Sequence, residues 1–316
     1  MKPVPKNQNE ITEENYYSSE IGRKYLSVHA LMTYLDDPSR FWLKAHDKLQ
    51  GTSSPSAKAG QVFHAFVNDK EDFDNRMIEH GLDMFKLGRK KKDVVDVLDM
   101  VYDDPSQLTP KSDYQSVWTF IVKYWDKRHE FWEEKDHFKE LILTGRIGGV
   151  PFKGRLDVLK VEKDHAYIYD YKTIGLKQSY GYWKDPETRQ FYPKTFVQEY
   201  NYDLQMTAYA ELVKQNFPNV KNVYVIFGLL IKSGKHDFVE YPTSFINTEP
   251  VNVKSFNVPR FDGQTPKEIL MHNSKLAYDL LQLDEETFNK RFDNQLFTEM
   301  IMQTGKSLPI ETFKLK

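Results

Sequence analysis

Residues 146–172 constrain the fold most, because their sequence predicts successive β-strands joined by tight turns. The dipeptide Gly148-Gly149 lies between apolar flanks and is typical of a short hairpin turn, and residues 152–161 then alternate well enough for a strand. A second turn at Lys163-Asp164 leads into the apolar and aromatic run 166–172. We therefore predict that the two strands on either side of this second turn pair antiparallel.

These strands carry two acids and a lysine in the order expected for metal chemistry. Asp170 and Lys172 are two positions apart and so share one face of a strand, and antiparallel pairing brings Asp157 alongside them. Mg²⁺ usually takes one or two carboxylates from a protein, while water and substrate phosphate fill its other positions. Lys172 can orient an attacking water or neutralise charge on the phosphate. The pattern therefore favours metal-dependent phosphodiester hydrolysis.

Alone, this pattern also fits an ordinary hairpin with solvent-facing acids and a cross-strand ion pair. Two further segments favour an active site over an ordinary hairpin. Residues 56–67 have a helical pattern and carry His64, and residues 203–213 place Gln205 and Tyr209 four positions apart on one helix face. Each residue alone is more often structural, as a core histidine or a packed tyrosine beside a surface amide. Their combined order is harder to explain in that way.

The ordered set resembles the PD-(D/E)XK nuclease superfamily, and within it the branch that includes the RecB nuclease domain and the RecE exonucleases (exonuclease VIII). The resemblance spans about residues 25 to 230. It implies an α/β fold with a restriction-endonuclease-like core, in which a central mixed sheet is flanked by helices. The matching segments are Tyr25 to Trp42, Gly60 to His64, Gly154 to Asp157, Asp170 to Thr173, and Gln205 to Tyr209.

The resemblance also implies residue roles and a cofactor. Mg²⁺ is the implied metal, and Mn²⁺ is expected to substitute for it. The implied metal ligands are His64, Asp157, Asp170 and the carbonyl of Tyr171, the implied catalytic lysine is Lys172, and Gln205 and Tyr209 are implied to contact DNA or to support the attacking water. This chain departs from the superfamily pattern in having Leu156 before the first acid, where a proline is nominal. Its second acid is Asp rather than Glu, which requires the strands to lie closer to the metal.

The activity implied by the resemblance is an exonuclease that degrades linear double-stranded DNA from 5′ to 3′. It would leave 3′ single-stranded tails for recombination by single-strand annealing, with a RecT-type annealing protein as partner. A phage or prophage origin and a ring-shaped homo-oligomer are implied as well. Two alternatives stay open: an endonuclease or structure-specific nuclease on the same core, and a non-catalytic DNA-binding protein. The complete set of two acids and a lysine argues against the second, because degenerate members of a fold usually lose a charged group.

The charge balance gives limited support for DNA binding. The net charge is −2, whereas most non-specific DNA affinity comes from lysine and arginine at phosphates. The distribution of charge therefore matters more than its sum. The densest basic run can be a phosphate track at the mouth of the site, or only a solvated loop. The candidate DNA contacts are Arg155, Thr173, and the basic run Arg89, Lys90, Lys91 and Lys92.

Composition fixes the expected compartment and domain organisation. The absence of cysteine excludes disulfides, thiolate zinc sites and cysteine-held iron–sulfur clusters. The sequence contains no apolar run of membrane-spanning length and no signal-peptide core near its first residues, so we expect a cytoplasmic protein of a bacterial host. Residues 1–20 are polar and predict a mobile N-terminal arm. Residues 21–316 then form a single nuclease domain with a helical N-terminal wall and C-terminal helices.

Further elements follow from hydrophobic periodicity. Between the D-x-K strand and the Gln205 helix, aromatic and basic residues interleave without a clear period, which suits either stacking on an unpaired DNA end or a packed lid. The expected elements are a helix from Ser27 to before Pro38, helices over 41–48, 111–134, 266–283 and 285–297, a loop over 175–200, and strands over 220–231 and 238–245.

Overall fold

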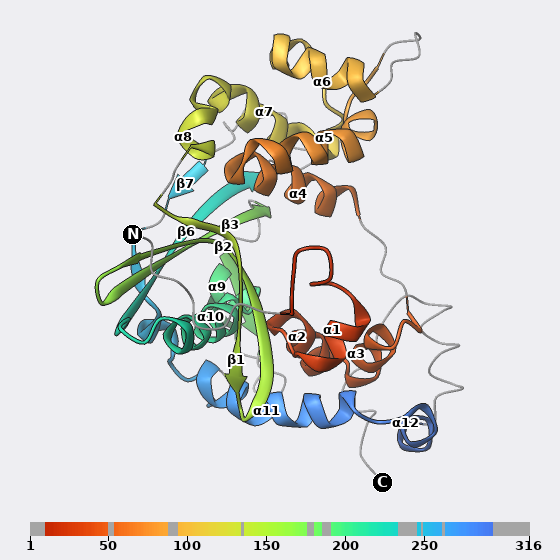
Figure 1. The fold of residues 1–316 in the computed structure, drawn as a ribbon, viewed down its shortest axis with the longest axis vertical. Coiled ribbons are helices and arrows are strands. Elements are labelled where there is room, and N and C mark those ends of the chain that lie inside the picture. Colours follow the sequence, from red (N-terminus) through yellow and green to blue (C-terminus); the bar gives the residue numbers. More distant parts are fainter. Residues whose placement is uncertain are drawn as a thin grey trace.

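A mixed six-stranded sheet forms the centre of the molecule in this computed structural model (Figure 1). The strand order is β1-β2-β3-β6-β7, and β8 also pairs with β6. Helices cover the sheet on both sides, so the predicted restriction-endonuclease-like fold is confirmed. The structure describes residues 10–49, 54–87, 94–133, 136–175, 180–184, 191–232, 245–247, 249–260 and 263–292.

The first three strands form the predicted antiparallel ladder. β1 (Phe138–Ile147) and β2 (Val150–Glu162) are joined by two glycines with φ values of 61° and 80°, which are left-handed conformations that glycine adopts without a Cβ clash. β2 pairs antiparallel with β3 (His165–Gly175) through the turn at Lys163, whose φ is 52°. The tight turns fix the register, which in turn decides which side chains meet.

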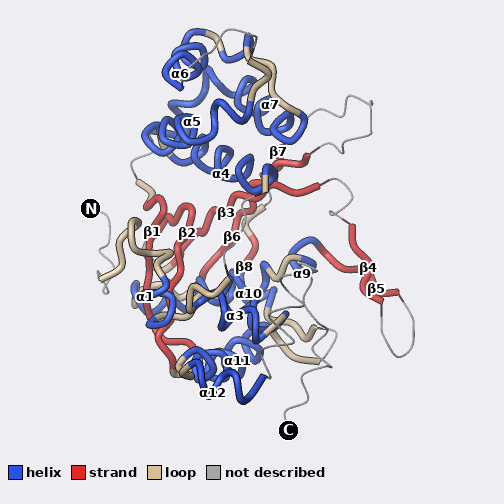
Figure 2. Tube along the Cα trace, turned by 90° about the vertical axis from the view of Figure 1, so that its right-hand side faces the viewer, coloured by secondary structure: helices blue, strands red, loops and turns tan. Residues whose placement is uncertain are grey.

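The rest of the sheet covers the far edge of β3. β6 (Asn222–Lys232) runs parallel to β3 along its whole length, and this confirms the strand expected at 220–231. β7 (Phe245–Asn247) and β8 (Val251–Asn252) pair antiparallel with β6, whereas residues 238–244 of the other expected strand lie outside the described residues. The expected loop over 175–200 contains a two-stranded hairpin that stands away from the main sheet in Figure 2, formed by β4 (Tyr180–Lys184) and β5 (Phe191–Thr195).

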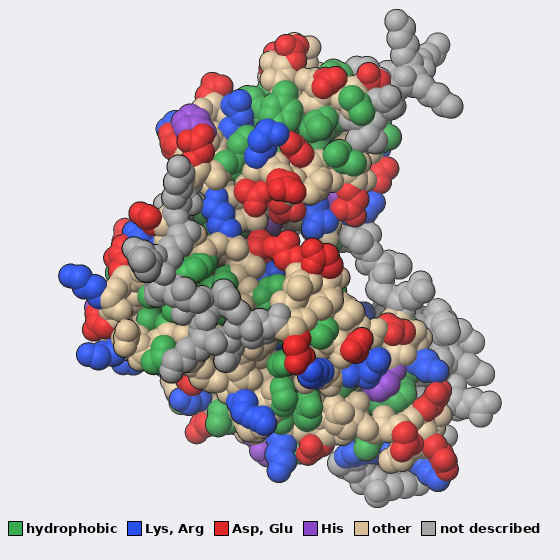
Figure 3. Space-filling view, in the orientation of Figure 1, with side chains coloured by type: hydrophobic (Ala, Val, Ile, Leu, Met, Phe, Trp, Pro, Cys, Tyr) green, Lys and Arg blue, Asp and Glu red, His purple; other side chains and the backbone are tan. Residues whose placement is uncertain are grey.

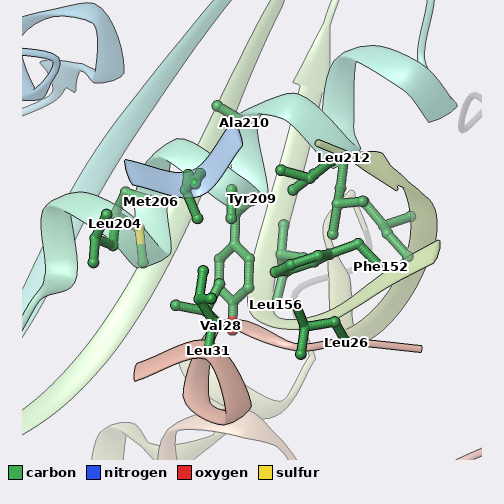
Figure 4. Close-up of a cluster of buried hydrophobic side chains, with 14 of the residues drawn as sticks. Leu26, Val28, Leu31, Phe152, Leu156, Leu204, Met206, Tyr209, Ala210 and Leu212 are labelled. Atoms are coloured by element: carbon green, nitrogen blue, oxygen red, sulfur yellow. The ribbon is translucent and has the colours of Figure 1, made fainter. Parts of the chain in front are cut away.

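Helices below the sheet pack around α10, and Figure 4 shows the cluster of apolar side chains between α10, β2 and α2. Ser27 caps α2 as predicted, because its hydroxyl accepts from the amide of Ala30. The next helix starts at Pro38 rather than at residue 41, since Asp37 caps it and proline fits the first helical position. These helices are α1 (Ser19–Lys24), α2 (Val28–Asp36), α3 (Pro38–Ala45), α9 (Phe196–Glu199), α10 (Tyr202–Asn216), α11 (Pro266–Leu281) and α12 (Glu285–Phe292).

A second group of helices lies above the sheet and has its own aromatic core. Phe66 lies at its centre and contacts the rings of Phe73, Phe120 and Trp125. The single long helix expected over 111–134 is wrong: a 3₁₀ turn at Trp125–Lys127 interrupts it and lets the aromatic residues on both sides turn inward. The group comprises α4 (Pro55–Asn68), α5 (Lys70–Met84), α6 (Val94–Asp103), α7 (Gln115–Tyr124) and α8 (Arg128–Trp132).

The N-terminal segment differs from the expected mobile arm. Residues 1–9 lie outside the described residues, but residues 10–20 pack onto the body of the protein. Ile11 and Tyr16 are buried, and they form a small cluster with Ile21. Two isolated apolar residues in a polar stretch have no period, so the sequence pattern did not indicate their burial. Within the described ranges, no helix has the length and apolar character needed to cross a membrane.

Gly154 allows α10 to approach β2 closely, and this gives a stability prediction. A Cβ at this position would lie 2.9 Å from both Leu212 Cδ1 and Tyr209 Cε1. Gly154→Val should therefore lower the free energy of unfolding by about 1–3 kcal/mol, as overpacking does. Urea denaturation measures this change. Gly22→Ala is the matched control, because a Cβ at that helical position meets nothing within 4 Å and should leave stability equal or higher.

Candidate active site

The two predicted acids meet at the end of the β2–β3 ladder. The last ladder pair is Val158 with Tyr169, and the next residues along each strand are Asp157 and Asp170. Beyond that pair, Asp157 Oδ2 accepts a hydrogen bond from the backbone amide of Tyr171 at 2.8 Å. The carboxylate of Asp157 thus lies against β3 beside the D-x-K segment, as antiparallel pairing requires.

Lys172 and Asp170 form a largely buried ion pair. Lys172 Nζ lies 2.9 Å from Oδ1 and 2.8 Å from Oδ2 of Asp170, whose side chain is only 1% exposed. Their positions two apart on β3 place both side chains on the same side of the strand, as predicted. Tyr202 of α10 adds a ring 5.0 Å from the same ammonium. The lysine is therefore fixed at the metal-site acids rather than free in solvent.

His64 of α4 approaches the acids from the upper helices. Its Nδ1 lies 3.5 Å from Asp157 Oδ2. Burial lowers the pKa of His64, and the charge of Asp157 only partly opposes this effect. The imidazole is therefore neutral at neutral pH, which is the form that binds metals. The structure brings together His64, Asp157, Asp170 and Lys172 from three separate parts of the chain.

Burial also affects the pKa values of Asp170 and Lys172. It raises the pKa of Asp170 to about 7, with the Lys172 ammonium opposing and the Asp157 carboxylate adding to the rise. Burial disfavours the charge of Lys172, but the carboxylates of Asp170 and Asp157 outweigh it and raise the pKa of the lysine above its ordinary value. Lys172 is accordingly a cation at any physiological pH. The two acids repel each other, which disfavours two full negative charges at once.

Gln205 and Tyr209 form one wall of the site. Gln205 Nε2 donates to the Tyr209 hydroxyl at 3.0 Å, and both side chains are buried. Burial raises the pKa of Tyr209 well above its ordinary value, so the phenol stays protonated. In Figure 4 the Tyr209 ring lies among apolar residues of α2 and β2. These residues supply neutral hydrogen-bonding groups, while their predicted roles in contacting DNA or supporting water stay predictions.

A cavity of about 530 Å³ connects these residues. His64, Asp157, Lys172, Gln205 and Tyr209 line it on the side of the sheet. The opposite side is formed by the N-terminal segment and by helices α1 to α3, including the side chains Tyr16, Tyr17, Tyr25, Thr33 and Lys44. Its volume is typical of small-molecule sites and suits one or two nucleotides rather than a duplex.

A second cavity of about 700 Å³ adjoins the first and shares Tyr17, His64 and Arg155 with it. Acids outnumber the cations Arg76, Lys139 and Arg155 in its lining, and Figure 3 shows acidic side chains gathered where the upper helices meet the sheet. The acids that line it are Glu13, Asp69, Glu71, Asp72 and Glu140. One side of the candidate site thus carries an excess of acids, which disfavours phosphates there.

Glu140 is a site residue that the sequence reasoning missed. It lies on β1 opposite Asp157 in the register set by neighbouring pairs, with a positive φ of 47° that is unusual for a non-glycine residue. Its Oε2 lies 2.9 Å from Arg155 Nε. Burial and the charge of Asp157 raise the pKa of Glu140 to about 8, against the effect of Arg155. A signal was available, because counting back from the Gly148-Gly149 turn places Glu140 opposite Asp157.

The predicted DNA contacts have different outcomes. Arg155 lines both cavities and is paired with Glu140, and its contact with DNA stays a prediction. Thr173 follows the catalytic segment on β3 and lines neither of the two cavities. The basic run Arg89, Lys90, Lys91 and Lys92 lies outside the described residues.

Comparison with known families agrees with this geometry. Residues 38–237 match a family described as a PDDEXK-like domain of unknown function (DUF3799), and the match covers more than half of the chain. The chain belongs to this family. The predicted membership of the PD-(D/E)XK superfamily is therefore confirmed, whereas the narrower likeness to RecE exonucleases stays a prediction. No curated protein matches the chain.

Solved structures show the same fold for this PDDEXK-like domain. The crystal structure of a putative exonuclease from Eubacterium rectale aligns with a TM-score of 0.55 and 15% identity, covering 96% of this chain and 90% of that chain. At such low identity the likeness shows the fold alone. The structure of SSO0001 aligns over 84% of this chain and 93% of that chain with 9% identity, but its TM-score of 0.26 is too low to bear on the fold.

The donor set of the PDDEXK-like domain fits a hard divalent cation. In the described part of the chain, no three His, Asp or Glu side chains are arranged to enclose a metal ion. Mg²⁺ does not need such a group, because it commonly takes one or two carboxylates and completes its shell with water and phosphate. Asp157 and Asp170 would hold the metal, with the Tyr171 carbonyl and neutral His64 as further donors. Bound there, the cation would relieve the repulsion between the acids.

Metal binding can be tested without any nuclease assay. Asp157→Asn and Asp170→Asn should each weaken Mn²⁺ binding by at least about 10-fold, because each removes a charged ligand. Isothermal titration calorimetry measures the affinity. Asp164→Asn is the matched control on the same hairpin, since that acid lies in the turn and bonds His165 instead. Unchanged Mn²⁺ affinity in both site variants would show that the metal is held elsewhere.

Lys153 gives a prediction for stability against pH. Burial lowers its pKa from 10.5 to about 8. Between these values the unfolded chain binds more protons than the folded protein, so stability rises with pH, and below pH 8 the full penalty of burying the charge is present. Urea denaturation at pH 7 and pH 10 should therefore show wild type gaining stability relative to Lys153→Met as pH rises. Parallel curves for the two proteins would contradict this account of Lys153.

Proposed function

We propose that this protein is a divalent-metal-dependent nuclease that hydrolyses DNA from the ends of linear duplexes. The observation that carries the proposal is the meeting of His64, Asp157 and Lys172 on one cavity, with Asp170 buried behind Lys172 and paired with it. Membership of the PDDEXK-like family supports a nuclease in general. A cavity of nucleotide size, partly open to solvent, supports action on a strand end.

The residues divide the chemical work. The bound metal would supply charge neutralisation at the phosphate and acidify a water. Asp157 and Asp170 hold that metal, and His64 remains neutral beside Asp157 because burial lowers its pKa. Lys172 keeps its proton and presents a fixed positive charge where negative charge develops during phosphoryl transfer. Gln205 and Tyr209 line the same cavity and offer neutral hydrogen-bonding groups to the substrate.

Charge favours an exonuclease over an endonuclease on this core. An endonuclease must accommodate the phosphate backbone on both sides of the scissile bond. In this protein a backbone that continued past the site would meet the second cavity, where acids such as Asp69 and Glu71 outnumber the cations. Like charges placed together are costly, particularly where water is partly excluded. A strand end that stops at the acids avoids this cost.

The finer features of the proposal rest on the resemblance to RecE-type exonucleases. They are the use of Mg²⁺ with Mn²⁺ as substitute, 5′ to 3′ polarity, and 3′ single-stranded tails for recombination by annealing. We further propose a homo-oligomeric ring and a RecT-type annealing partner. We also propose that the protein is of phage or prophage origin and acts in the cytoplasm of a bacterial host. Each goes beyond what the fold and the family support.

End-labelled DNA tests the substrate and the polarity together. A linear duplex labelled separately at each 5′ and 3′ end is incubated with Mg²⁺ and either wild type or Asp170→Ala. The 5′ label should be released first by wild type and retained with the variant, while a circular plasmid stays intact. Early release of the 3′ label would reverse the polarity, and cleavage of the circle would indicate an endonuclease. Intact linear duplex would refute the nuclease.

Lys172→Ala tests the cation in catalysis. The variant should lower the cleavage rate by about 100- to 1000-fold, as loss of a preorganised charge in an active site does. Rates are measured with DNA in excess, and circular dichroism confirms folding. Lys163→Ala is the control, because that lysine occupies the exposed turn of the same hairpin. Full activity of Lys172→Ala would remove this lysine from the mechanism.

A further inference from the structure

Tyr17 is exposed at an unusual place. Its side chain is 75% exposed, and among the large apolar side chains exposed in the described ranges it is the only aromatic one. It lines both cavities and so lies at their boundary, together with His64 and Arg155. An exposed aliphatic side chain needs no explanation, but an exposed aromatic ring at the mouth of a catalytic cavity has a surface ready to stack.

Tyr17 is also held in a fixed position. Arg155 Nη2 donates to its hydroxyl at 2.9 Å, and the guanidinium lies 5.2 Å from its ring centre. Its ring packs edge-on against Tyr16 with centroids 5.0 Å apart, and Tyr16 is buried. Arg155 is in turn paired with Glu140. The exposed ring is thereby tied to β2 only two positions from Asp157, and little order has to be gained when a ligand stacks on it.

The cations that the sheet contributes to the cavity are already engaged, which gives stacking more weight. Lys172 is paired with Asp170, and Arg155 with Glu140. Lys153 donates to the backbone carbonyl of Tyr16 and lies 4.4 Å from its ring centre. Three cations of the sheet that line the cavity therefore have partners in the protein. A strand end entering beside them gains less from phosphate contacts than free lysines and arginines would give.

We propose that Tyr17 is a stacking platform for an unpaired nucleobase of the DNA strand that enters the catalytic cavity. Every base has a π-face, so the platform accepts any sequence, as a nuclease of this type requires. The cavity volume of about 530 Å³ suits an unpaired strand rather than a duplex. This inference rests on the proposed nuclease function and names the part of the substrate that the site recognises.

A double-mutant cycle, which combines Tyr17→Ala with removal of single nucleobases from the DNA, tests the stacking. DNA binding is measured by fluorescence anisotropy with Ca²⁺ in place of Mg²⁺, using duplexes that carry a three-nucleotide 5′ or 3′ overhang with an abasic position placed at each nucleotide in turn. Tyr17→Ala should weaken binding to the intact overhang by about 5- to 100-fold, the range for loss of one stacked base. At one abasic position, the affinity of wild type should fall by the same factor relative to the intact overhang. The affinity of Tyr17→Ala should not fall further at that position.

Two further variants separate stacking from structure. Tyr17→Phe keeps the ring and should bind within about threefold of wild type, because only the hydroxyl contact with Arg155 is lost. Ile78→Ala is the matched control for removing an exposed apolar side chain, since Ile78 is 52% exposed on α5 and lines neither cavity. Thermal unfolding should be unchanged in all three variants.

The outcomes separate this inference from the proposed function. If wild type degrades DNA and binds it, but no abasic position is coupled to Tyr17, the stacking platform is wrong and the nuclease stands. If Tyr17→Phe binds as poorly as Tyr17→Ala, the hydroxyl and not the ring is responsible, and stacking is likewise refuted. If wild type neither binds nor degrades DNA, both proposals fail.

Discussion

The buried pair between Lys172 and Asp170 is the interaction on which the candidate site depends. Removing two charges from water costs several kcal/mol per ion, and only close attraction and additional hydrogen bonds offset that cost. Both partners are on β3, which is held on one side by β2 and on the other by the full parallel register with β6. Loss of either partner leaves a buried charge that costs about 3–5 kcal/mol. The pair therefore requires a rigid sheet around it.

Close packing of α10 supplies much of that rigidity. Gly145 and Gly154 lie on β1 and β2 where a Cβ would collide with side chains of α10. The absence of side chains at these positions lets the helix lie against the strands and brings Tyr209 to the cavity wall. Gly154, the glycine of the G-x-x-D segment, thus allows α10 to approach β2 closely, three positions before Asp157. The strand β2 therefore carries both the close contact with α10 and one of the two acids of the candidate site.

The sequence predicts the centre of this site better than its edges. Tight turns determine strand register, so the meeting of Asp157 with the D-x-K segment follows from the turn at Lys163. Helical spacing likewise indicates the pairing of Gln205 and Tyr209. Residues 10–20 and the broken helix after residue 124 could not be predicted in the same way. Their conformations depend on contacts between distant segments, such as Tyr16 with Lys153 and Trp125 with Phe66, which leave no period in the local sequence.

Charge in the sequence is an incomplete guide to DNA contacts, for a physical reason. A run of lysines suggests a DNA-binding track, but a cation attracts phosphate only to the extent that the protein has not already neutralised it. Arg155 illustrates the point: its sequence position beside Asp157 indicates a phosphate contact, whereas Glu140 on the neighbouring strand takes up its charge. Pairing across strands is set by register rather than by proximity in sequence. The same ion pair that reduces the attraction of Arg155 for phosphate fixes the arginine under Tyr17, so electrostatic affinity is exchanged for a rigid aromatic surface. Binding that relies on such a surface depends less on salt than binding through free cations, because fewer counterions are released.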